Sequence, residues 1–129
     1  MADVTVTNSA FTALNTITTV TKNAASTDVD NTAQNFVITP TKAGKMLVII
    51  IGGTGSGADG NLTYSISAGD LWASKAITGT VTKNTEKMLR VDTAQVLQDD
   101  GTIVVSLAPA STDKLLTDHA AYVKVIEML

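Results

Sequence analysis

Residues 62–68 of this chain read Leu-Thr-Tyr-Ser-Ile-Ser-Ala, so apolar and small polar residues alternate with a period of two. Successive side chains of a β-strand point to opposite faces of a sheet, and this stretch therefore predicts a strand with one buried and one solvated face. The alternation returns at 102–107, where Ile103, Val105 and Leu107 share one face. Strands of this kind are typical of an antiparallel sheet that covers a core on one side.

Further strands are expected on either side of this stretch. Phe36 and Ile38 share a face over 34–39, and 45–51 is a continuous apolar run, which is typical of a strand buried on both faces. The other expected strands are residues 4–6, 78–82, 86–91 with a continuation at 96–97, and 120–129. About seven to nine strands separated by turn residues predict an all-β fold, an antiparallel β-sandwich of jelly-roll type with little helix.

The composition agrees with this fold class. Threonine is the most frequent residue, whereas glutamate and arginine, which usually fill helix surfaces, are rare. The 129 residues suffice for one domain. Because the chain has no cysteine and a single histidine, it offers no disulfide scaffold, thiol catalysis or thiolate metal site. A net charge of −3 argues against a nucleic-acid surface.

The chain shows no sign of a membrane or secretory segment. Its first residues lack a basic and apolar leader, so we expect a protein made in a cytoplasm. The longest apolar run, residues 46–51, is far shorter than the about 20 residues with which a helix spans a bilayer. We therefore expect no membrane partner.

Residues 1–32 differ from the rest, because they are rich in Thr, Asn, Ser and Ala and hold few large apolar side chains. Two interpretations stay open for them: the first hairpin of the domain, or an extended arm that grips a partner. The sandwich domain itself is expected over residues 33–129. An alternating segment can add to the edge of a neighbour's sheet, and the candidate contacts of this kind are Asp3, Val4, Thr5 and Val6.

A glycine-rich loop follows the apolar run 45–51, and Gly55-Ser56-Gly57 begins a G-x-G-x-x-G sequence in it. A dinucleotide site of this type needs a helix to start at the loop, because helix N-terminal amides hold the pyrophosphate. The alternating strand 62–68 follows instead, so we expect a flexible hairpin loop and no nucleotide or other cofactor. Exposed glycine loops often carry partner contacts, which makes Gly55, Ser56 and Gly57 candidates.

Two further sites invite a chemical interpretation. Asp99 and Asp100 precede a glycine, which predicts a solvated hairpin turn with a positive φ at the glycine and makes both aspartates candidate partner contacts. His119 follows Asp118, but adjacent strand residues face opposite sides of a sheet. We therefore expect a surface histidine, no catalytic pair and no enzyme activity, since no serine lies in a G-x-S-x-G motif either.

Two further features bear on metal and sugar binding. Residues 28–31 begin like a calcium loop, but the glycine and glutamate that such a loop needs further on are missing, so no metal site is expected. Trp72 is the only tryptophan. It either packs in the core or forms a platform for a sugar ring, and both interpretations stay open.

Three stretches carry a resemblance to a known class of protein. They are the apolar strand 45–51 running into Gly52-Gly53, the stretch 89–97 followed by 99–103, and the closing strand 123–129. Together they resemble small head proteins of tailed bacteriophages, the decoration or cementing class, over about residues 34–129. The resemblance implies a β-sandwich on the outside of a capsid, with no active site, the major capsid protein as partner, and a homo-oligomer, most often a trimer.

Two alternatives remain beside this one. The first is another virion part such as a tail or neck protein, and the second is a carbohydrate- or calcium-binding sandwich module. Either way, the strand assignments predict a buried core that includes Leu47, Ile49, Leu62, Tyr64, Ile66, Leu89, Val105 and Val125.

Overall fold

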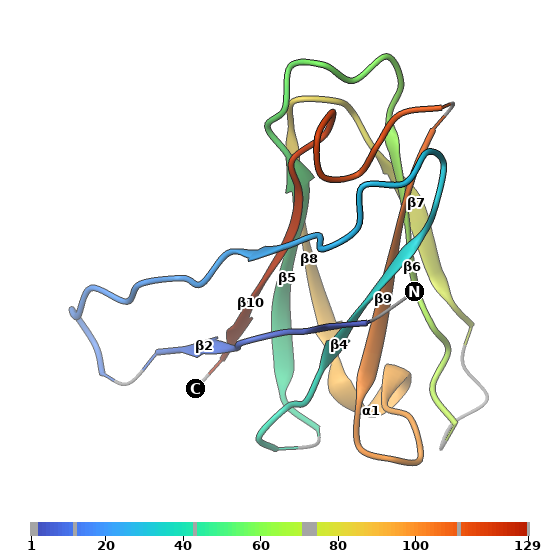
Figure 1. The fold of residues 1–129 in the computed structure, drawn as a ribbon. Helices are drawn as coiled ribbons and strands as arrows, with labels where there is room; N and C mark the ends of the chain where they lie inside the picture. Colours follow the sequence, from blue (N-terminus) through green and yellow to red (C-terminus); the bar gives the residue numbers. More distant parts are fainter. Residues whose placement is uncertain (1–2, 12, 43, 71–74, 111, 129) are drawn as a thin grey trace.

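Two β-sheets pack face to face with one hydrophobic core between them (Figure 1). The structure is a computed structural model that describes residues 3–11, 13–42, 44–70, 75–110 and 112–128. Trp72, for which core packing and a platform for a sugar ring stay open, lies outside the described residues.

Each sheet has five strands. The first sheet has, from edge to edge, β1 (Val4–Thr5), β4 (Gln34–Ile38), β9 (Ile103–Pro109), β6 (Leu62–Ile66) and β7 (Ile77–Val81). The second has β2 (Ser9–Ala10), β10 (Ala121–Glu127), β5 (Met46–Gly53) and β8 (Glu86–Asp92), with β3 (Asn23–Ala24) also paired to β10. One short helix, α1 (Thr93–Val96), follows β8.

The predicted fold class, an all-β sandwich with little helix, is confirmed. The strand number is slightly higher than predicted, because residues 1–32 contribute three strands of two residues each. Two of these short strands also pair in parallel, β1 with β4 and β2 with β10. All other strand pairs of the described residues are antiparallel, as the alternating sequence predicts.

The core lies where the alternation predicts it, with one exception. Seven of the eight predicted core residues are buried. Leu89 is only half-buried and packs against the core from the side, because β8 is an edge strand of the second sheet. The expectation that residues 45–51 are buried on both faces is wrong. Leu47, Ile49 and Ile51 point into the core, whereas the residues between them are half-buried on the outer face of the sheet.

Most connections cross from one sheet to the other, and this changes two predicted hairpins. Among the described strands only β6 and β7 are neighbours both in the chain and in a sheet. The glycine loop joins β5 of the second sheet to β6 of the first, so it is not a hairpin loop. The turn at 99–101 has its predicted positive φ at Gly101, yet it too connects the two sheets.

Helix α1 replaces the strand that was expected to continue at 96–97. Asp92 has an extended backbone and accepts a hydrogen bond from the Ala94 amide at 3.0 Å, which makes it the N-cap of the helix. An aspartate in this position satisfies an amide that the first helical turn leaves free. The cap therefore explains why the chain leaves the sheet after β8 despite its apolar Val96 and Leu97.

Candidate functional site

The N-terminal contact candidates lie in the chain's own first sheet. Val4 and Thr5 of β1 pair with Phe36 and Val37 of β4. The Val6 amide continues this pairing with a 2.9 Å bond to the Val37 carbonyl, and the Val6 side chain is buried in the core. One side of the backbone of this segment is thus used within the chain, and β1 forms an edge of the first sheet. Only the side chains of Asp3 and Thr5 remain exposed for a partner.

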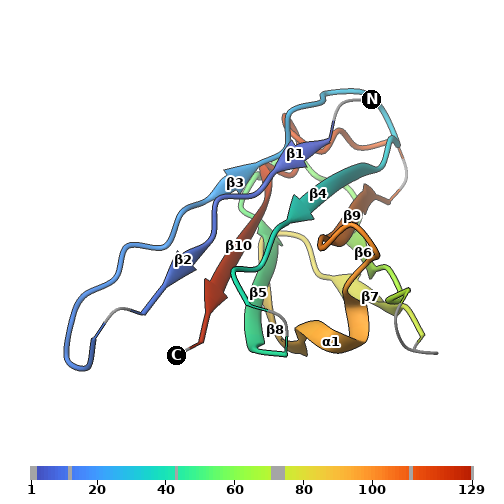
Figure 2. The ribbon, with the colours of Figure 1, turned by 90° about the horizontal axis from the view of Figure 1, so that it is seen from below.

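Residues 9–24, called the projection below, leave the sandwich and return to it (Figures 1 and 2). At its base, β2 and β3 both pair with the same edge of β10. The Asn23 amide ties the base together, because its oxygen accepts from the Thr7 amide at 2.8 Å and its nitrogen donates to the Val123 carbonyl at 3.0 Å. The Ser9 hydroxyl accepts a further bond from Thr21 at 3.0 Å. The sequence left residues 1–32 open between a first hairpin and an extended arm, and their Thr- and Asn-rich stretch shows no strand period that locates this element.

The glycine loop is fixed by a buried carboxylate. One oxygen of Asp113 accepts hydrogen bonds from the amides of Asp59 at 3.0 Å and Gly60 at 2.9 Å. The same oxygen lies 3.0 Å from Nε2 of His119, which is only 1% exposed. The expectation of a surface histidine is therefore wrong: His119 pairs with Asp113, six positions away in the loop before β10, and not with Asp118.

The environment of Asp113 favours its charged form. The amides of Gly60 and Asp59 and the imidazole of His119 all point at the carboxylate, and they lower its pKa below the usual value. A carboxylate with several donors organises a loop strongly, because charge-assisted hydrogen bonds are shorter and stronger than neutral ones. The loop predicted to be flexible is in fact held at its far end.

The near end of the glycine loop lies against the backbone of residues 118–119. The Gly55 amide donates to the His119 carbonyl at 3.0 Å. A Cβ atom on Gly53 would lie 2.3 Å from the His119 carbonyl oxygen, and one on Gly55 would lie 2.2 Å from the Asp118 carbonyl oxygen. These glycines therefore permit a close backbone approach, while Ser56 and Gly57 stay exposed at the tip of the loop.

The turn at 99–101, which holds Asp99 and Asp100, lies at the opposite end of the sandwich from the glycine loop (Figure 1). In the β6–β9 pair Leu62 faces Pro109, whereas the turn at 99–101 precedes the other end of β9. Both aspartates are exposed. The hydroxyl and amide of Thr102 donate to Asp100 and lower its pKa. The structure thus places the contact candidates at two ends and one edge and does not bring them together into one site.

The described part of the chain holds no cluster of potential metal ligands. No three His, Asp or Glu side chains gather there closely enough to hold a metal ion. Asp28, the first residue of the rejected calcium loop, accepts hydrogen bonds from the amide and the hydroxyl of Thr117. Its carboxylate therefore joins two loops of the protein.

Comparisons with known proteins do not assign this chain to a family. No family model, curated protein or solved structure matches it. Within the described ranges, no helix has the length and apolar character that a membrane crossing requires.

The outer face of the second sheet carries a cluster that sequence patterns did not reveal. Tyr122 points outward between the inward-facing residues of β10, yet it is buried. The ammonium groups of Lys22 and Lys124 lie 4.6 and 5.0 Å from the centre of its ring. Its hydroxyl is hydrogen-bonded to Glu86, which also pairs with Lys124 at 3.2 Å. Lys22 belongs to the projection, so this cation–π contact ties the projection to the sheet.

Tyr122 is expected to stay protonated at a pH at which free tyrosine is half ionised. Burial and the neighbouring Glu86 raise the pKa of Tyr122 above its ordinary value of 10.0. Its contribution to stability is thus fully present below about pH 10 and is lost as the pH rises further. In Tyr64→Phe, where Tyr122 is the only tyrosine, phenolate absorbance should stay low at about pH 10 and appear on alkaline unfolding.

The same variant in concentrated urea serves as the control. Its tyrosine should titrate with a pKa of about 10, because unfolding removes both the burial and the neighbouring carboxylate. Half-ionisation of the folded variant near pH 10 would show that Tyr122 is solvated in solution.

Proposed function

We propose that this chain is a virion structural protein that binds the outside of a phage capsid lattice and stabilises it, without catalysis. One observation carries the proposal: a firmly tied sandwich body bears a projection whose base is fixed by hydrogen bonds and whose tip reaches away from the body (Figure 2). This is the shape of a protein that works by contact with neighbours. It supports the assembly role that the sequence resemblance implies, and the homo-oligomer, with a trimer favoured, is part of this proposal.

A rigid body suits a protein that stabilises a lattice. The loops of the sandwich are held by buried polar side chains at several places. Gln34 accepts from the Ser26 amide at 2.8 Å, Glu127 accepts from the Thr41 amide at 2.7 Å, and Asp113 fixes the glycine loop. Loops held in this way lose little conformational entropy on binding, so more of the contact energy remains for the partner.

The exposed contact candidates fit a bridging role. Ser56 and Gly57 lie at one end of the sandwich, and Asp99 and Asp100 at the other. A molecule with contact loops at both ends can bind two adjacent capsid subunits at once. Binding to two sites on one lattice raises the avidity well above the affinity of either contact.

Co-sedimentation with capsids tests this proposal. The purified protein should pellet with capsids of the phage that encodes it, saturate at a fixed stoichiometry, and stay in the supernatant alone. Replacing both Asp99 and Asp100 by alanine should weaken binding roughly tenfold, the effect of losing about 1.4 kcal/mol of contact energy. Asp30→Ala, an exposed carboxylate outside the proposed contacts, is the matched control and should bind like the wild type.

Two outcomes would contradict the proposal. If the protein binds purified tails and not capsids, it belongs to another part of the virion. If it binds neither, the assembly function is wrong.

A further inference from the structure

The tip of the projection exposes large aliphatic side chains. Ile17 is 97% exposed and Leu14 is 86% exposed, far more than the other large apolar residues that reach the surface of the described chain. The sequence between Asp3 and Lys22 contains no charged residue. Two large aliphatic groups exposed three residues apart on an uncharged element are unusual for a surface that faces only water, and they are typical of an interaction site.

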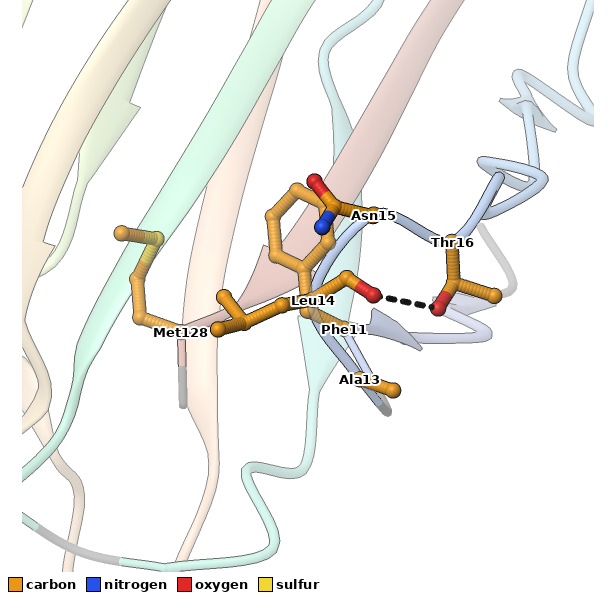
Figure 3. A pocket seen from close by; sticks show the side chains of 6 residues that line it. All are labelled: Phe11, Ala13, Leu14, Asn15, Thr16 and Met128. Atoms are coloured by element: carbon orange, nitrogen blue, oxygen red, sulfur yellow. Dashed lines mark hydrogen bonds between the residues drawn. The ribbon is translucent and has the colours of Figure 1, made fainter.

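A hollow lies beside these side chains. It measures about 370 Å³ and is lined by Phe11, Ala13, Leu14, Asn15, Thr16 and Met128. Leu14 points toward Met128, and the Phe11 ring lies beside it (Figure 3). Ile17 does not line this hollow. The projection therefore carries an apolar knob, Ile17, and close to it an apolar hollow that the chain itself leaves open.

We propose that the projection is a self-association surface, in which Ile17 of one copy enters the Phe11–Leu14–Met128 hollow of a second copy of this chain. A knob and a hollow at different places on one chain fit copies that associate head to tail, because each copy inserts its own knob into the next copy and receives a knob in its hollow. Such a contact closes into a ring, as in a trimer, when the rotation between copies allows it. Neither side carries a charge that would have to be desolvated. This inference rests on the homo-oligomer part of the proposed function and names the surface that makes it.

The base of the projection supports this role. Asn23, Ser9 and the pairing of β2 and β3 with β10 hold the two ends of the projection in place. Lys22 adds its contact with the Tyr122 ring. A preorganised element gives up less freedom on association than a loose arm, which favours a specific contact between copies.

Mass measurement by light scattering tests the inference on the full chain. The wild type should have a mass of at least twice the 13.4 kDa of one chain. Ile17→Asp should raise the dissociation constant of the oligomer at least about 30-fold, the effect of losing a central interface residue. Val29→Asp is the matched control, because Val29 is also an exposed aliphatic residue, at 55%, but lies outside the projection. It should leave the mass unchanged.

Folding of the variants is checked separately. Ile17 makes no core contact, so Ile17→Asp should keep the circular dichroism spectrum of the wild type. A wild type that is monomeric at roughly 100 μM, a weak limit for a specific contact, overturns the inference. An Ile17→Asp protein with the wild-type mass overturns it as well.

Capsid binding distinguishes this inference from the proposed function. An oligomer that Ile17→Asp dissociates, but that binds no capsid, upholds the self-association surface and contradicts the capsid role. A monomeric wild type that binds capsids upholds the capsid role and contradicts the self-association surface. If such a monomer loses capsid binding in Ile17→Asp, the projection contacts the capsid and not a second copy.

Discussion

Ile49→Ala is expected to lower the free energy of unfolding by about 2–5 kcal/mol, the usual cost of truncating a buried aliphatic side chain. Ile49 lies in the middle of β5, fully buried, with Val125 of β10 on one side and Leu89 of β8 on the other. The loss has two sources, the apolar surface that is no longer buried and the cavity that close-packed neighbours cannot fill. Urea denaturation followed by fluorescence or circular dichroism measures it.

Ile50→Ala is the matched control, because it removes the same atoms one position along the same strand. Ile50 points to the outer face and is half-buried, so its loss should be clearly smaller than that of Ile49. A shift of one residue in strand register exchanges the two faces of a strand. A larger loss for Ile50 than for Ile49 would therefore mean that β5 pairs in the other register.

Gly53→Ala should destabilise the protein by about 1–3 kcal/mol or more, although it adds a single methyl group. That group would lie 2.3 Å from the carbonyl oxygen of His119, and a backbone oxygen cannot move without displacing the loop that Asp113 and His119 hold together. Thermal or urea unfolding measures the effect.

Gly57→Ala, in the same loop, is the control for this prediction. Its Cβ atom would meet the end of the Asp118 side chain at 3.2 Å, and a side chain can give way. The change in stability should stay within about 0.5 kcal/mol, as for most surface substitutions. Equal losses for the two variants would show that the loop does not pack against residues 118–119 in solution.

The strands and their buried faces could be predicted from the sequence because burial on one face leaves a period-two pattern. At 62–66 and 103–107 the inward residues are apolar and the outward residues are mostly small or polar, so the pattern alone gives the right face. The outer face of β5 misled the prediction. Val48 and Ile50 are apolar there although they face outward, and the strand therefore reads as fully buried.

The contacts that organise the loops leave no recognisable pattern in the amino-acid sequence. Asp113 and His119 meet because the loop before β10 folds back on itself, and the glycine loop joins them from more than 50 positions away. No local spacing of residues predicts contacts between segments so far apart in the sequence. Gly53 and Gly55 can be seen in the sequence, but the reason why glycine is needed at these positions cannot. It is the close approach to the backbone of residues 118–119, which only the folded structure shows.

The pairing of β10 has a consequence for how the chain folds. This strand follows all others in the sequence, yet it lies between β5 and the N-terminal strands, and Ile126 pairs with Ser9. The second sheet therefore cannot close before residues 121–127 have been synthesised. Contacts between such distant segments are slow to form, because a long loop must close before any pairing energy is gained. We expect the second sheet to be completed only after residues 121–127 have been made, with β2 and β3 lacking their partner until then and β5 paired with β8 alone.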